Sequence, residues 1–255
     1  IANAHLACME LEGDSLLAAV DTNAQSAAAV ADKYGCSAMS SVDDMLAAVR
    51  PDAAVIAAPP HVHKDIAATL LNAGITVLCE KPLAHTVEDA VALAEPADKT
   101  GTPAYVAYCH RFNPAAQMVR EHVSDGKLGR VLYFRNGFSG HVSLFDNSWR
   151  LDPAISGGGS LIDTASHSLD LFQFILGPID GAKASFYFRD AGRGDLAGSL
   201  MVTSSDGVAG HVMFGWANSK PECMFEVVGT DMSLSYDYVT SGATVQAYKP
   251  NQEVE

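Results

Sequence analysis

A short apolar run ends in residues that could contribute to catalysis. Ile75 to Cys79 is apolar and β-branched, begins after Gly74, and is followed by Glu80-Lys81-Pro82. The pattern predicts a buried parallel strand with polar groups at its carboxyl end, where open α/β sheets bind ligands. Pro82 disfavours helical backbone at Lys81, so the lysine is well placed to meet a ligand. The alternative is an ordinary solvated Glu-Lys pair after a strand.

A second group of reactive side chains follows three glycines. After Gly157-Gly158-Gly159, residues Asp163, His167 and Asp170 have the spacing i, i+4 and i+7, which places them on one face of a predicted helix. An oriented imidazole beside a carboxylate is the usual general acid or base, and the glycines would permit close approach of a ligand. Alternatively, Ser160 and Asp163 form a capping box, and His167 is a core histidine.

An acidic residue ends the first predicted strand. Asp21 follows the run 16–20 and stands where a dinucleotide-binding fold keeps the acid that binds ribose, about 20 residues after its glycine turn. The opening residues contain no GxGxxG motif. The alternative role for Asp21 is a turn or cap before the next helix, because Asp-Thr-Asn is a good capping sequence.

Strands and helices alternate through the first part of the chain. Apolar runs at 16–20, 53–58, 75–79 and 104–108 are separated by helical patterns at 23–34, 41–49, 63–73 and 87–99. This order is typical of βαβ units and a parallel sheet. We therefore predict an α/β Rossmann dinucleotide-binding domain over residues 1–112, with its first strand missing because the sequence opens on a helical segment.

The pattern changes after residue 112. A helix at 114–123 is followed by alternating runs at 131–137, 182–188, 196–203, 208–216 and 224–228, with one helix from residue 160 between the first two. These runs predict a largely antiparallel open sheet in an α+β domain over residues 113–255. Both faces of the run 208–216 carry apolar side chains, so we expect helices on one face and a second subunit on the other.

Composition excludes several classes of protein. The 255 residues carry a net charge of −14, with no basic stripe, so nucleic acids and anionic membranes are not expected partners. Five widely spaced cysteines form no CxxC pair, which argues for a reduced cytoplasmic protein and against a metal site. No segment is long and apolar enough to suggest a membrane span.

Together these motifs resemble the glucose–fructose oxidoreductase, inositol dehydrogenase and rhizopine-catabolism family, Gfo/Idh/MocA. The resemblance covers nearly the whole chain. It rests on the opening Ile1–His5 segment, Val20-Asp21, Ala58-Pro59-Pro60 with His63, Ala73-Gly74, Cys79-Glu80-Lys81-Pro82, His110–Pro114, Trp149-Arg150, the Gly157 to Asp170 stretch and Val228-Gly229-Thr230.

The resemblance implies NAD(P)-dependent hydride transfer to or from a secondary alcohol carbon of a sugar, polyol or cyclitol. It implies that His167 is the base, that Asp163 orients it or shares its proton, and that Lys81 binds the reacting oxygen. Lys81 and His167 lie on different domains, so only a shared active site would bring them together. We therefore expect the Lys81 ammonium and the His167 imidazole to face one cleft, roughly 6 to 7 Å apart when both bind a common atom. The partner is a small molecule, with a homodimer or homotetramer formed through the second-domain sheet.

Further positions are implied to bind the cofactor. Glu80 would lie near the nicotinamide ribose, and Asp21 would accept from the adenosine ribose and repel a 2′-phosphate, which favours NAD over NADP. The remaining positions would line the dinucleotide path or close over nicotinamide and substrate: Pro59, His63, Arg111, Trp149 and Arg150.

Two departures and two alternatives accompany the resemblance. The first strand and glycine turn are absent, and more residues are expected after Glu255, so we expect a fragment whose own activity is reduced. Relatives of this fold that hydrolyse glycosides with transient use of NAD provide one alternative function. A non-catalytic NAD- or sugar-binding protein is the other, although Lys81, Asp163 and His167 argue for catalysis.

Overall fold

The structure is a computed structural model that describes residues 1–141, 149–242 and 244–250. The chain divides into two compact units, Ile1–Ala107 and Tyr108–Glu255. The domain boundary expected after Phe112 thus lies a few residues inside the second unit. Each unit has its own hydrophobic core.

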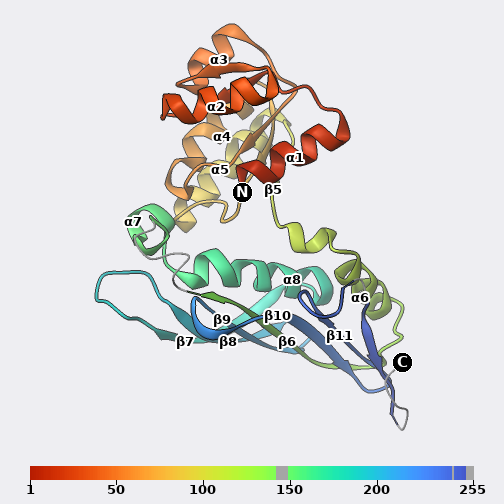
Figure 1. Cartoon of the computed structure of the whole chain (residues 1–255). Helices are drawn as coiled ribbons and strands as arrows, with labels where there is room; N and C mark the ends of the chain where they lie inside the picture. Colours follow the sequence, from red (N-terminus) through yellow and green to blue (C-terminus); the bar gives the residue numbers. More distant parts are fainter. Residues whose placement is uncertain (142–148, 243, 251–255) are drawn as a thin grey trace. The chain divides into compact units, whose positions relative to one another are not determined.

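The first unit alternates helices and short parallel strands (Figure 1). Its elements are α1 (Ala2–Glu12), β1 (Ala18–Val20), α2 (Ala24–Tyr34), β2 (Ser37–Met39), α3 (Val42–Ala48), β3 (Ala53–Ile56), the 3-10 turn η1 (Pro60–Val62), α4 (His63–Asn72), β4 (Thr76–Cys79), α5 (Val87–Thr100) and β5 (Ala104–Val106). The short strand β2 was not expected, because its three residues show no apolar alternation.

The parallel strands of the first unit lie in two sheets. One pairs β1 with β2, and the other has the order β3-β4-β5. Among the residues that the structure describes, no strand joins β1 to β3. Side chains of Asn23, Ser41 and Thr86 accept from backbone N–H groups in the first turns of α2, α3 and α5, which fixes where these helices begin.

The second unit is a seven-stranded sheet with helices on one face (Figure 1). The strands are β6 (Val131–His141), β7 (Ile179–Tyr187), β8 (Ala197–Ser204), β9 (Ala209–Gly215), β10 (Ala217–Gly229), β11 (Ser233–Asp237) and β12 (Gln246–Tyr248), in the order β12-β11-β10-β6-β9-β8-β7. All neighbours are antiparallel except β6 and β9, which are parallel. The predicted largely antiparallel sheet is confirmed.

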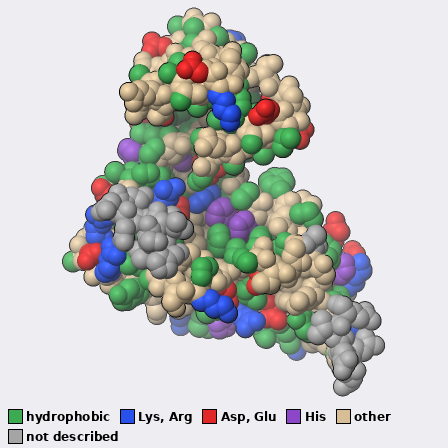
Figure 2. All heavy atoms as spheres, viewed as in Figure 1, with side chains coloured by type: hydrophobic (Ala, Val, Ile, Leu, Met, Phe, Trp, Pro, Cys, Tyr) green, Lys and Arg blue, Asp and Glu red, His purple; other side chains and the backbone are tan. Residues whose placement is uncertain are grey.

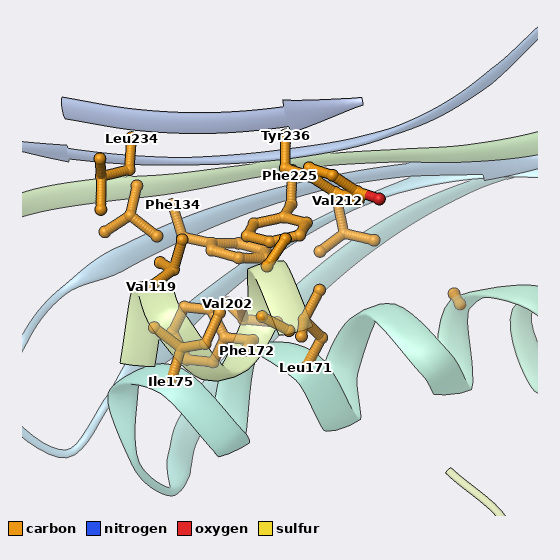
Figure 3. Packing of buried hydrophobic residues seen from close by; sticks show 14 of the residues in the cluster. Val119, Phe134, Leu171, Phe172, Ile175, Val202, Val212, Phe225, Leu234 and Tyr236 are labelled. Atoms are coloured by element: carbon orange, nitrogen blue, oxygen red, sulfur yellow. The ribbon is translucent and has the colours of Figure 1, made fainter. Parts of the chain in front are cut away.

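Helical elements supply the other layer of this unit. They are the 3-10 turn η2 (Cys109–Phe112), α6 (Pro114–Ser124), the turn η4 (Trp149–Leu151), α7 (Pro153–Ser156), the π-helical segment η5 (Leu161–Ala165) and α8 (Ser166–Leu176). Figure 3 shows side chains of α6 and α8 packed against the sheet, with Phe134 and Phe172 in edge-to-face contact at 5.5 Å between ring centroids. This apolar layer fixes α8, the helix that carries His167.

Charged side chains of both signs are present on the face of the molecule drawn in Figure 2. Among the described residues, no helix combines the length and hydropathy needed to cross a membrane.

Candidate active site

At the carboxyl end of β4, Glu80 is nearly buried and both of its carboxylate oxygens have contacts. Oε1 lies 2.7 Å from Nε2 of His5, a residue of α1 that is 75 positions earlier in the chain. Oε2 accepts from the backbone N–H of Lys81 at 3.1 Å. The Glu80 carboxylate therefore fixes the backbone from which the Lys81 side chain extends. A solvated Glu-Lys pair does not describe this turn, because Glu80 is only 8% exposed.

His63 is fully buried at the start of α4. Its Nε2 lies 2.7 Å from the carbonyl oxygen of Ala58, and its Nδ1 lies 3.1 Å from that of Pro82 and 3.2 Å from that of Leu83. Both polar atoms of the ring therefore face backbone carbonyl groups. In place of the expected direct lining of the cofactor path, the ring joins the loop after β3 to the loop after β4.

Asp21 is exposed directly after β1, at the carboxyl end of a parallel strand as expected. Its Oδ1 accepts from the backbone N–H of Asn23 at 2.8 Å, while Asn23 itself caps α2. The carboxylate thus has a local turn contact and an exposed surface, so ribose binding stays a prediction. Pro59, also expected to contact the cofactor, is partly buried and precedes η1.

In the second unit, His167 lies in a group of aromatic rings. It is 8% exposed. Its ring is stacked on that of His110 with 4.5 Å between centroids and 17° between planes. Tyr108 and Phe138 contact the same ring edge-to-face at 6.0 and 5.8 Å. These rings come from the start of the unit, from η2 and from β6, so His167 is oriented by three segments besides its own helix.

His110 is in turn contacted by Tyr238, which directly follows β11. The hydroxyl of Tyr238, just after β11, lies 3.3 Å from Nδ1 of His110. Burial, followed by the nearby Cys223 and Tyr236, raises the pKa of Tyr238. The phenol therefore keeps its proton and can donate it to the imidazole nitrogen. Burial also raises the pKa of Tyr108, with a further contribution from the Asp170 carboxylate.

Arg111 is paired with a carboxylate of α8. Its Nε and Nη2 donate to the two oxygens of Asp170 at 2.7 and 2.5 Å. This bidentate bond raises the pKa of Arg111 and attaches η2 to α8, which brings His110 beside His167. The helical spacing predicts that Asp170 faces the His167 imidazole. In the structure, its carboxylate binds Arg111 instead. Binding of nicotinamide or substrate by Arg111 stays a prediction.

Asp163 lies in the π-helical segment η5, where the angular spacing of an α-helix does not apply. Its Oδ1 is 3.9 Å from Nε of Arg150, whose guanidinium lies over the ring of Trp149 at 4.6 Å. Three of the predicted residues, Asp163, Trp149 and Arg150, are therefore neighbours. Direct pairing of Asp163 with His167 stays a prediction.

The start of η5 is capped by Asp195, a residue that no sequence motif singles out. Its carboxylate accepts from the backbone N–H groups of Gly159 and Leu161 and from the hydroxyl of Ser160. A Cβ on Gly159 would lie 2.1 Å from the carbonyl oxygen of Asp195. The expectations that the glycines make room for a ligand and that Asp163 caps the helix are thus replaced by packing against the Asp195 loop.

Cys109, His110 and His167 place possible metal ligands within 4.8 Å of one another. The two imidazole rings are stacked and nearly parallel, however, so their in-plane lone pairs run alongside each other. Convergence on one ion would need a ring to rotate out of the stack.

Several neighbours of the candidate residues were not predicted as functional. His110 lies within the quoted motif His110–Pro114, so its type and position could have suggested it. His5 ends the quoted segment Ile1–His5, which suggested no role for its side chain. Tyr238 lies in a turn, and Asp195 lies in the loop before β8. The contacts of these three residues depend on pairings distant in sequence.

Comparison with known proteins agrees with this arrangement. Residues 1–108 match the oxidoreductase family with an NAD-binding Rossmann fold, and residues 116–235 match the GFO/IDH/MocA C-terminal domain. The chain belongs to the Gfo/Idh/MocA family. The predicted combination of a Rossmann domain and a second, mostly antiparallel domain is thereby confirmed.

The chain is similar to several named proteins, some of which it covers only in part. The chain is 30% identical to the rhizopine catabolism protein MocA of Rhizobium meliloti, covering 84% of this chain and 71% of that protein. It is 33% identical to levoglucosan dehydrogenase of Pseudarthrobacter phenanthrenivorans over 51% of this chain, but spans only 34% of that relative. The fold matches the WlbA dehydrogenase of Bordetella pertussis, solved with NADH and UDP-GlcNAcA, at a TM-score of 0.89 and 23% identity, covering 99% and 79% of the two chains.

Proposed function

We propose that the protein carrying this chain oxidises a secondary alcohol carbon of a sugar, polyol or cyclitol, or reduces the corresponding ketone, with NAD as hydride carrier. The observation that carries the proposal is the position of His167 in a chain of this family. A nearly buried imidazole, oriented by stacking on His110, suits a general base better than a solvated histidine would.

His167 would take the hydroxyl proton as the carbon–oxygen bond becomes a carbonyl, and would return it in the reverse direction. Asp163, in η5 before the same helix, would orient the imidazole or exchange the proton with it. The guanidinium of Arg150 lies 3.9 Å from this carboxylate.

Lys81 would bind the reacting oxygen and stabilise the negative charge that develops there. A lysine side chain is long and flexible, so its usefulness depends on a fixed backbone position. The contact of Glu80 with the Lys81 N–H at 3.1 Å supports this position.

Residues of the first unit fit a dinucleotide. Asp21 and Glu80 place carboxylates after β1 and β4, where ribose hydroxyl groups can donate to them. Nicotinamide, when bound, accepts or supplies the hydride. The exposed carboxylate of Asp21 would disfavour a 2′-phosphate, so NAD is proposed over NADP.

The relatives and the site together support a proposal for the substrate class. Levoglucosan dehydrogenase and a WlbA protein solved with UDP-GlcNAcA are both concerned with carbohydrates. We therefore propose a carbohydrate or cyclitol substrate with a free secondary hydroxyl group.

A homodimer or homotetramer through the second-unit sheet is also proposed. Buried and exposed residues alternate along most of β8 and β9 and over residues 133–136 of β6. The exposed residues include Tyr133, Met201 and Met213 at 41, 56 and 44%. Exposed methionine and tyrosine side chains on an open sheet face suit burial against an identical sheet. In the described part of the chain the five cysteines form no disulfide, which agrees with the proposed cytoplasmic location.

The function is tested by incubating the purified protein with NAD or NADP and a panel of sugars, polyols and cyclitols. Formation of reduced cofactor together with an equal amount of ketone supports the proposal. Release of an aglycone from glycosides without net reduced cofactor would indicate glycoside hydrolysis instead. Tight cofactor binding without turnover of any panel member would indicate a binding protein.

A further inference from the structure

The turn that carries Lys81 is contacted by two histidines from different parts of the first unit. His63, at the start of α4, lies against the carbonyl oxygens of Pro82 and Leu83 at 3.1 and 3.2 Å. His5, on α1, lies 2.7 Å from the carboxylate of Glu80. Lys81 thus lies between a carboxylate held by one imidazole and a carbonyl group held by another.

The contacts of His63 bridge two loops. Its second ring nitrogen, Nε2, lies 2.7 Å from the carbonyl oxygen of Ala58, beyond β3. Carbonyl oxygens only accept, so a proton on either ring nitrogen finds an acceptor. The ring is fully buried, with no atom exposed for a ligand. Its position therefore transmits the geometry of the β3 loop to the Glu80-Lys81-Pro82 turn.

The contact of His5 adds a second support. Glu80 could rotate if its carboxylate contacted only the Lys81 N–H. With Oε1 against His5 and Oε2 against the N–H of Lys81, both oxygens are fixed. The side chains are 21% and 11% exposed, so water competes little for this pair.

We propose that His5 and His63 are positioning residues, which set the place and direction of Lys81 through Glu80 and Pro82 without touching the substrate. The proposal rests on the function proposed above, in which Lys81 binds the reacting oxygen. A displacement of about 1 Å at a reacting group can lower a rate by roughly 100-fold, so small shifts of this turn would be visible in kcat.

Four substitutions and one control test the proposal. His63→Phe keeps a ring but removes both nitrogens, and His63→Gln keeps one donor. His5→Leu removes the contact with Glu80, whereas His5→Gln keeps a donor for the carboxylate. The control is His61→Gln, an exposed histidine of η1 only two residues before His63.

The expected result is a separation of kcat from cofactor binding. For His63→Phe and His5→Leu, we expect kcat to fall about 10- to 100-fold. For His63→Phe, the Kd for NAD should change less than about threefold, whereas His5→Leu also frees the Glu80 carboxylate proposed to bind ribose. His5→Gln should recover most of the activity that His5→Leu loses, and His61→Gln should match the parent protein. A merely structural role would lower the melting temperature and leave kcat per folded molecule unchanged.

Hydrogen exchange of the Lys81 amide, measured by mass spectrometry, gives a readout that needs no substrate. We expect faster exchange in the peptide that contains Lys81 for His63→Phe and His5→Leu, and no change for His61→Gln. Failure of the parent protein to oxidise any alcohol would contradict the proposed function, while exchange would still test the support of the turn. Unchanged exchange and kcat in folded His63→Phe would overturn the proposal. If His63→Phe does not fold, the same measurements on His5→Leu decide it. A parallel loss of kcat and NAD affinity in His63→Phe would also overturn it.

Discussion

The candidate residues of the two units are fixed by different kinds of contact. In the first unit, His5 and His63 contact a carboxylate and backbone carbonyl groups beside Lys81. In the second, His167 is oriented by stacked and edge-on rings, and Asp170 by a bidentate arginine. Polar contacts with the backbone fix the base of a flexible lysine, whereas ring contacts fix the plane of an imidazole. Each arrangement suits the role proposed for the residue that it supports.

The largest expected effects come from the two proposed catalytic groups. Lys81→Ala and His167→Ala should each lower kcat by about 100- to 1,000-fold, because an oxyanion contact or a proton acceptor is lost. Binding of NAD, measured by titration calorimetry, should remain within a few-fold of the parent value. Near-normal turnover of either variant would show that the substituted residue has no catalytic role. The contacts that support that residue in its unit would then have no bearing on catalysis.

Loss of the arginine contact should destabilise the second unit. Removing one partner of a buried ion pair costs about 3–5 kcal/mol. The Arg111 side chain is 42% exposed, so we expect Arg111→Met to lower the free energy of unfolding in urea by about 2 kcal/mol. Lys127→Met, which removes an ion pair between two exposed side chains, is the control and should change it by less than about 0.5 kcal/mol. Equal effects would show that the contact between η2 and α8 adds nothing.

Asp21 concerns the first unit alone. Asp21→Ser should narrow or reverse the preference for NAD over NADP by roughly tenfold, because a charge-assisted hydrogen bond and a repulsive charge are both removed. Kinetics with both cofactors at several concentrations would measure the ratio of kcat/KM. A parent protein that already prefers NADP would refute the premise.

The smallest expected effect on stability concerns Asp237, which directly precedes Tyr238 at the end of β11. Backbone N–H groups of Thr240 and Val239 hold the pKa of Asp237 below its ordinary value of 3.8. A depressed folded-state pKa contributes stability that is present above the unfolded value and lost as pH falls through the folded one. Urea unfolding should therefore show the parent more stable than Asp237→Asn at neutral pH, with the difference vanishing in acid. A difference that grows on acidification would contradict this sign.

Sequence predicted the positions that depend on local chain order. Glu80-Lys81-Pro82 was placed correctly after a buried parallel strand, because an apolar run that ends in polar residues reports a strand end directly. The alternating run 208–216 likewise indicated a strand, but both of its faces carry apolar side chains, so only the structure shows that Val212 and Phe214 are buried and that His211 and Met213 are exposed.

The remaining features depend on contacts between distant segments. The π-helical hydrogen bonds of η5 change the angular spacing between Asp163 and His167 around the helix axis. The types of residues 161–165 do not indicate a π-helix. The glycines before η5 suggest space for a ligand, but Gly159 packs against the backbone of Asp195 and Gly158 against the side chain of Ile162. The stack of His110 on His167 depends on the Arg111 and Asp170 pair, whose members are 59 residues apart.

The central claim is that Lys81 and His167 act on one hydroxyl group. A crystal structure of the protein with NAD and a carbohydrate substrate identified in the panel would test it directly. We predict that Nζ of Lys81 and one ring nitrogen of His167 each lie about 3 Å from the same hydroxyl oxygen, and therefore no more than roughly 6 to 7 Å from each other. A complex in which the two side chains contact different ligands, or lie on opposite faces of the molecule, would contradict the claim.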